Sequence, residues 1–165
     1  MGQLRAVLTA YAYDGDPPDR VLAHVSSRST ALLDLPMATA IAAIYDPVAR
    51  RLTFALAGHL PPLVAPLDAP PAFVGAAPGP PLGAGVTEYE RHAIDVPDGA
   101  TIVLYTDGLI EDRSRSIDVG LEQLRAGLID VRLPPEAVCD HVLRELGRAD
   151  GGEDDIALLV MSHAP

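Results

Sequence analysis

Carboxylates stand at two places where the chain leaves or enters an apolar strand pattern. Asp107 directly follows the run Thr101–Thr106, which is rich in β-branched, aliphatic and aromatic residues. Asp154 and Asp155 directly precede the apolar run Ile156–Met161. If these two strands pair antiparallel, the end of the first lies beside the start of the second, about 5 Å away across the ladder. The spacing therefore predicts that Asp107 and Asp154 share one site.

Such a site would have metal-binding chemistry, because two hard oxygen ligands at one sheet edge suit Mg²⁺ or Mn²⁺. A structural alternative exists for each residue. The Asp107-Gly108 pair is above all a turn signal, and Asp154 and Asp155 can cap a loop. On spacing alone, these structural roles are favoured over a metal site. The metal interpretation gains because both strands are apolar and the other acids fall in helices, turns and the polar segment near Asp118.

Two further residues are candidates for chemistry, and both have a structural interpretation that is favoured. His59 follows an apolar strand pattern, so we expect it to brace a loop near the carboxylates through a hydrogen bond, outside the first metal shell. Cys139 lies in an apolar helical stretch and is expected in the core. The chain offers no persuasive Ser, Cys or His triad, so a protein nucleophile is not expected.

The elements that must position these residues follow from hydrophobic periodicity and turn signals. The apolar runs Thr39–Tyr45 and Leu52–Ala57 predict a hairpin around Asp46 and Pro47. Further patterns predict strands at 87–96, 101–106 and 156–161, and helices at 1–13, 16–33, 119–129 and 134–146. The loop 66–85 is rich in Pro, Gly and Ala, with room for one short strand at Phe73-Val74. This order indicates an α+β domain with a mostly antiparallel sheet covered by helices.

Composition limits the classes of function. A length of 165 residues with 48% hydrophobic residues suits a single domain. Aromatic residues make up only 4%, so base-stacking platforms are not expected. The formal net charge of −11 argues against nucleic acid and against anionic lipid. A phosphate-binding site on this chain would therefore need bound cations to reverse the local field.

The single cysteine and the apolar runs bear on the compartment. One cysteine allows no intramolecular disulfide, which favours a reducing compartment. No apolar run reaches the length of a membrane span, and the N-terminus lacks a signal-peptide pattern. We therefore expect a cytoplasmic protein without membrane attachment.

An ordered set of motifs resembles a known family. The segments are TAIAAIYDP, ALAGHLPPLV, PLG, VPDGATIVLYTDGLIED and GGEDDIALLV. In this order they resemble the bacterial SpoIIE/RsbU-like branch of the metal-dependent protein phosphatases, the PPM family, over nearly the whole chain. The resemblance implies a sandwich of mostly antiparallel sheets flanked by helices, with two Mn²⁺ or Mg²⁺ ions at one edge. It also implies hydrolysis of phosphoserine or phosphothreonine, typically on small anti-anti-sigma proteins, and it allows an upstream sensor domain.

By motif match, the resemblance assigns roles to five residues. Asp107 and Asp154 are implied as metal ligands and catalytic residues, and Gly108 belongs to the same TDG motif at the metal site. Glu111 resembles an outer-shell acid that holds a metal-bound water. Asp155 falls where the family often has a second polar residue. The implied mechanism is attack on phosphorus by a water that the metals activate.

One motif of that family does not occur in this sequence. Related domains carry a Gly-Asp-Val-x-Gly-His-Gly-like motif upstream, whose Asp bridges both metals, whereas this chain is expected to begin in mid-helix. We therefore expect one PPM-like domain over residues 1–165 that is incomplete at its N-terminus and lacks the first strands. Two interpretations remain open: a phosphatase domain, and a catalytically incompetent module that binds a regulatory partner. Under the first, we expect weak Mn²⁺ binding and little activity from this polypeptide alone.

Overall fold

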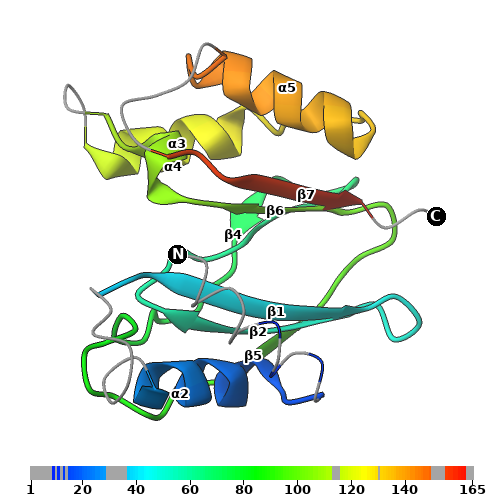
Figure 1. Ribbon diagram of the computed structural model, residues 1–165. Coiled ribbons are helices and arrows are strands. Elements are labelled where there is room, and N and C mark those ends of the chain that lie inside the picture. Colours follow the sequence, from blue (N-terminus) through cyan, green and yellow to red (C-terminus); the bar gives the residue numbers. More distant parts are fainter. Residues whose placement is uncertain are drawn as a thin grey trace. The chain divides into compact units, whose positions relative to one another are not determined.

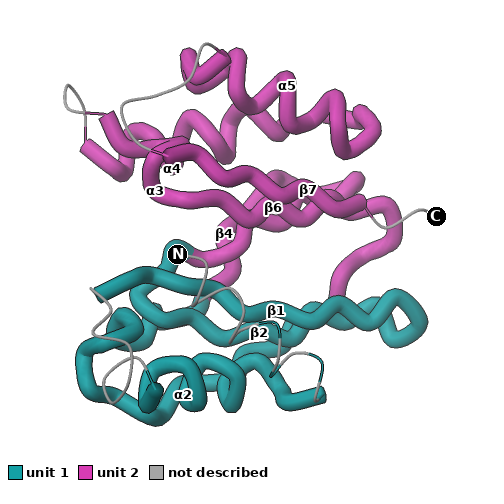
Figure 2. The backbone as a smooth tube through the Cα atoms, viewed as in Figure 1, with its two compact units in different colours: residues 1–60, 76–95 teal, residues 61–75, 96–165 magenta. Residues whose placement is uncertain are grey.

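The chain forms two compact units that each draw on separate parts of the sequence (Figure 2). The computed structural model describes residues 9, 11, 13, 15–28, 37–112, 116–129, 131–149 and 155–162. Unit 1 comprises residues 1–60 and 76–95, and unit 2 comprises residues 61–75 and 96–165. Both units are built from an antiparallel sheet and helices, which confirms the predicted α+β class.

Unit 1 contains a three-stranded antiparallel sheet in the order β1-β2-β5 (Figure 1). The strands are β1 (Ala40–Asp46), β2 (Arg51–Ala57) and β5 (His92–Asp95). The predicted hairpin is present, with Ala40 opposite Ala57 and Asp46 opposite Arg51. Its turn is held by the Asp46 carboxylate, which accepts the amide hydrogens of Val48 and Ala49, each at 2.9 Å.

Helix α2 (Pro18–Arg28) packs on this sheet through small side chains. Leu22 and Val25 of the helix form one buried cluster with Ala55 and Ala57 of β2. Alanine at these strand positions leaves room for the helix to come close, and Tyr11 and Tyr89 pack against the cluster from its edge. The opposite side of β2 also carries fully buried side chains, led by Phe54.

Unit 2 contains a four-stranded antiparallel sheet in the order β4-β3-β6-β7. The strands are β3 (Leu63–Ala65), β4 (Ala72–Phe73), β6 (Thr101–Tyr105) and β7 (Leu158–Ser162). The helices are α3 (Asp107–Ile110), α4 (Ile117–Ala126) and α5 (Pro135–Glu145), and α5 packs on β7. Figure 1 shows these helices together on one face of the sheet.

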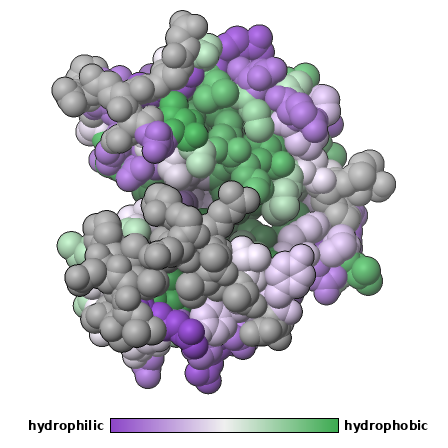
Figure 3. Space-filling view, viewed as in Figure 1, coloured by the Kyte–Doolittle hydropathy of each residue, from purple (hydrophilic) through white to green (hydrophobic). Residues whose placement is uncertain are grey.

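Apolar surface gathers over β7 (Figure 3). Among the described residues, β7 pairs with β6 only, so it is an edge strand there. Leu159 of this strand is half exposed. None of the helices in the described part of the chain is long and apolar enough to cross a membrane.

Two strands begin two or more residues later than the sequence predicted, and both delays have a local cause. β5 begins at His92 instead of Thr87, because the edge of β2 beyond Phe54 is taken by Gly79, which exchanges backbone hydrogen bonds with Leu56 and Gly58. β7 begins at Leu158 instead of Ile156. There the amide of Ala157 donates to a side chain, the hydroxyl of Thr106, at 2.8 Å.

The other predicted elements agree with the structure where it describes them. The short strand expected at Phe73-Val74 is β4. In the predicted helix at 1–13, the described residues 9, 11 and 13 are helical and the rest lie outside the described residues. The helix predicted at 16–33 is described only to Arg28. The helices predicted at 119–129 and 134–146 correspond to α4 and α5.

A bidentate ion pair in unit 1 provides a test of this packing. Arg91 donates from Nε and Nη2 to the two carboxylate oxygens of Asp19, at 2.6 Å and 3.1 Å, and so ties the first turn of α2 to the segment before β5. The guanidinium lowers the pKa of Asp19 below its ordinary value of 3.8. The stability gained is therefore fully present above that ordinary value and is lost as the pH falls through the lowered pKa of the folded state.

We predict that Arg91→Ala lowers the urea midpoint of unfolding at pH 7 and that the difference from the wild type becomes smaller as the pH falls below 3.8. Arg51→Ala is the matched control, because its partner Asp95 is 84% exposed and the pair makes one 2.7 Å contact. Urea titrations at pH 7 and near pH 3 measure both effects. Equal losses from the two variants at pH 7 would contradict the prediction.

Candidate metal centre

The end of β6 and the start of β7 lie side by side, as the antiparallel arrangement required. The ladder runs from Thr101 opposite Ser162 to Tyr105 opposite Leu158. It continues one step further, because the amide of Thr106 donates to the carbonyl of Ala157 at 3.0 Å. The predicted pairing of these two strands is therefore confirmed.

Thr106 joins the two segments with its side chain as well. Its hydroxyl donates to the carbonyl of Asp155 at 3.2 Å and accepts the amide hydrogen of Ala157 at 2.8 Å. The same hydroxyl makes no capping hydrogen bond to α3, although Thr106 occupies the N-cap position. Thr106 precedes Asp107, and Asp155 follows Asp154 in the sequence. These hydrogen bonds therefore connect the two backbone segments on which the predicted ligands lie.

Asp107 begins α3, and its side chain is exposed to solvent. One carboxylate oxygen accepts the amide hydrogen of Gly108 at 2.9 Å, which leaves the other lone pairs open to a ligand. The amide of Glu111 closes the helical turn by donating to the carbonyl of Asp107 at 2.7 Å. Glu111 is the C-cap residue of this turn, with an extended backbone and an exposed side chain.

The other predicted site residues differ in burial and in whether the structure describes them. Gly108 is buried beneath the turn, and Asp155 is exposed on the segment that precedes β7. Asp154 lies outside the described residues, so its approach to Asp107 stays a prediction. Within the described ranges, no three His, Cys, Asp or Glu side chains form a cluster that could hold a metal ion.

The donor set nevertheless has the right chemistry for a hard divalent cation. Asp107, Glu111 and Asp155 are exposed carboxylates on two backbone segments that Thr106 joins. Carboxylate oxygens are the ligands that Mg²⁺ and Mn²⁺ favour. The described acids therefore fit such an ion in the type of their ligand atoms.

His59 makes the kind of hydrogen bond that the sequence predicted. Its Nδ1 lies 2.8 Å from the carbonyl oxygen of Leu60, in the segment that leaves β2. The predicted loop-bracing role is consistent with this contact. Its nearness to the carboxylates stays a prediction.

Cys139 is less buried than expected. It lies on α5 and is partly exposed instead of forming part of the core. Partial burial raises the pKa of its thiol, and the neighbouring acids Asp140 and Glu136 add to that rise. A thiol with a raised pKa is a poor nucleophile at neutral pH, which agrees with a structural role.

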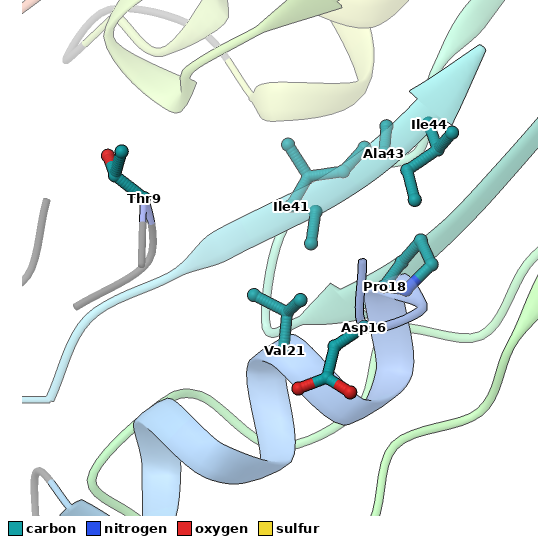
Figure 4. A pocket seen from close by; sticks show the side chains of 8 residues that line it. Thr9, Asp16, Pro18, Val21, Ile41, Ala43 and Ile44 are labelled. Atoms are coloured by element: carbon teal, nitrogen blue, oxygen red, sulfur yellow. The ribbon is translucent and has the colours of Figure 1, made fainter. Parts of the chain in front are cut away.

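A separate pocket of about 290 Å³ lies in unit 1 and contains none of the predicted site residues (Figure 4). Its walls come from the start of α2, with Pro18 and Val21, and from Ile41–Ile44 of β1. Of the described residues that line it, only Thr9 and Asp16 contribute polar side chains. This pocket has an apolar lining without the convergent polar groups of a catalytic site.

The sequence matches the family model described as Stage II sporulation protein E (SpoIIE) over residues 1–164. The chain belongs to the SpoIIE family. This match confirms the resemblance to the SpoIIE/RsbU-like branch that the motifs indicated.

Solved structures of phosphatase domains share the fold. The RsbU and RsbW domains of a Mycobacterium tuberculosis protein match with a TM-score of 0.88 and 28% identity, over 100% of this chain and 47% of that chain. The SiaA-PP2C domain of Pseudomonas aeruginosa matches with a TM-score of 0.77 and 19% identity, over 96% of this chain and 65% of that chain. RsbX in complex with magnesium matches with a TM-score of 0.71 and 13% identity, over 98% of this chain and 71% of that chain. The SpoIIE-family chain thus spans about half of the first of these chains.

The Thr106 hydroxyl was not singled out by sequence, and its role can be tested. Thr106→Val keeps the shape but removes both side-chain hydrogen bonds and leaves the Ala157 amide without its partner. We predict a loss of about 1 kcal/mol in the free energy of unfolding. Thr101→Val is the control at the other end of the same strand pair, where the hydroxyl has one 3.3 Å contact with Ser162. Urea unfolding measures both, and a larger loss from Thr101→Val would refute the role of Thr106.

Proposed function

We propose that residues 1–165 form one Mn²⁺- or Mg²⁺-dependent protein serine/threonine phosphatase domain. The observation that carries the proposal is the attachment of Asp107 to the Asp155 segment through Thr106. In a SpoIIE-family chain, this attachment supports a site at one sheet edge that carboxylates from two backbone segments share. The magnesium complex of the similar RsbX fold supports a divalent metal here.

The chain's own residues would divide the work. Asp107 and Asp154 would hold the metal, with Gly108 in the turn that orients Asp107. Glu111 and Asp155 would accept hydrogen bonds from water at the edge of the site, and Glu111 would help to orient the attacking water. When bound, the divalent ions would supply charge neutralisation for the phosphate and a lowered pKa for water. Asp107 and Asp154 are therefore proposed as the catalytic ligands, without a protein nucleophile.

The proposed substrate is a phosphoserine or phosphothreonine on a regulatory protein of the anti-anti-sigma type. The net charge of −11 repels a phosphate, so recognition of such a substrate depends on the cations at the site. In the similar Mycobacterium tuberculosis protein, an RsbU domain occurs together with an RsbW domain. That association supports a regulatory protein as partner, with neither nucleic acid nor membrane as ligand.

We predict that Asp107→Asn weakens Mn²⁺ binding at least about tenfold, because the amide keeps the shape but lacks the charge that holds the cation. Asp118→Asn is the matched control, since Asp118 is an exposed acid in the first turn of α4. Free Mn²⁺ measured by electron paramagnetic resonance gives both affinities. An unchanged affinity in Asp107→Asn would refute the metal site.

Phosphate release from a phosphoserine protein forms the second measurement. We expect a low rate from this chain alone, a rate that requires Mn²⁺, and its loss in Asp107→Asn. Release that persists in excess chelator would contradict metal dependence. Binding of the phosphoprotein without any release would favour the partner-binding module instead.

A further inference from the structure

The orientation of Asp107 and of the C-cap residue Glu111 depends on a helical turn that is too short to be stable by itself. Helix α3 has four residues, Asp107–Ile110. A single turn fixes several dihedral angles for very few hydrogen bonds, so it is unstable in isolation. Its N-cap hydroxyl makes no hydrogen bond to the helix. Contacts from other elements must therefore determine where its carboxylates stand.

One such contact comes from α4. Gly120 is buried against α3, where a Cβ atom would overlap the carbonyl oxygen of Ile110 and lie 2.9 Å from its carbonyl carbon. Only glycine allows this approach, so the backbone of α4 packs directly against Ile110, the last residue of α3. This contact limits movement of the turn in one direction. The carbonyls at the end of the turn still need hydrogen-bond donors from elsewhere.

Arg148 supplies those hydrogen bonds. Its Nη2 donates to the carbonyl oxygen of Glu111, and its Nε donates to that of Leu109 at 3.4 Å. The same guanidinium lies 3.7 Å from a carboxylate oxygen of Asp112. Only 11% of the Arg148 side chain is exposed. A buried cation at the carbonyl end of a helical turn is favourable for both its hydrogen bonds and its charge.

Arg148 is itself held by the end of α5. The amide of Gly147 donates to the carbonyl of Arg144 at 3.0 Å, and the amide of Arg148 donates to that of Leu143 at 2.7 Å. Gly147 has a φ of 68°, in the left-handed region. These two bonds and the glycine form a Schellman motif, which fixes the direction in which the chain leaves the helix. From this position the Arg148 side chain reaches the carbonyls of Leu109 and Glu111.

We propose that Arg148 is a positioning residue of the metal centre, which holds the α3 turn so that Asp107 and Glu111 stay at the site. The inference rests on the proposed phosphatase function. In this role Arg148 acts through the turn, because its Nε and Nη2 donate to the carbonyls of Leu109 and Glu111. Its removal should therefore loosen the turn and, through the turn, weaken metal binding.

The test separates the turn from the metal. Without metal, hydrogen exchange of the Glu111 amide reports opening of α3, since that amide bonds to the carbonyl of Asp107. With metal, Mn²⁺ titration reports the site. We expect Arg148→Ala to speed exchange at Glu111 and to weaken Mn²⁺ binding about tenfold, the scale of an outer-shell partner. Arg148→Lys keeps the charge but loses the guanidinium fork, so it should give smaller changes in both.

Arg144→Ala is the matched control, because Arg144 is an exposed arginine in the last turn of α5. It should leave both measurements unchanged. If Arg148→Ala and Arg148→Lys leave Glu111 exchange and Mn²⁺ affinity at wild-type values, the inference is overturned. If Asp107→Asn weakens Mn²⁺ binding and Arg148→Ala does not, the inference fails while the proposed function stands. If neither variant alters the affinity, the proposed function itself fails.

Discussion

The register between β6 and β7 is the constraint on which the candidate site depends. Side chains alternate across a strand, so a slip of one residue would turn every side chain of the edge strand β7 to the opposite face of the sheet. The central strand β6 is buried on both faces through Ile102, Val103 and Tyr105 and is also paired with β3. Thr106 then adds side-chain bonds that occur only in this register. Hydrophobic burial and two hydrogen bonds therefore select the same alignment, and that alignment brings the carboxylate segments together.

Beyond the ladder, small residues allow elements to meet where a larger side chain would keep them apart. In unit 1, α2 packs against Ala55 and Ala57. In unit 2, the end of α3 packs against Gly120. A chain with 4% aromatic residues and no Trp cannot fill its core with rings, so it depends on close approach of backbones. Such packing leaves little room for change, since even one methyl group at Gly120 would meet backbone atoms.

Much of the fold could be predicted because its signals are local. The hairpin of β1 and β2 has apolar runs on both sides of Asp46 and Pro47, and β6 has a turn signal before it and Asp107 after it. The late starts of β5 and β7 could not be predicted, because they depend on competition for hydrogen bonds by Gly79 and Thr106. No periodic pattern contains that information.

The residues of the candidate site could likewise be predicted only in part. Asp107, Glu111 and Asp155 were identified by their positions at strand ends and by motif match, and the structure describes all three. Thr106 was included only as the end of a strand, and Arg148 was missed, because its role arises from a helix end 37 residues from Glu111. A local signal did exist: Gly147 follows the apolar stripe of a predicted helix, where a left-handed cap is common.

The placement of Arg148 also bears on the proposed dependence of the site on metal. A guanidinium near exposed carboxylates is an obvious candidate to attract phosphate. Here its Nε and Nη2 donate to the carbonyls of Leu109 and Glu111, and the guanidinium lies 3.7 Å from a carboxylate oxygen of Asp112. These contacts direct the arginine to the turn that carries Asp107. The proposed attraction for a phosphate at this corner then depends on cations that the carboxylates bind, which connects the acidic composition of the chain to the proposed metal dependence.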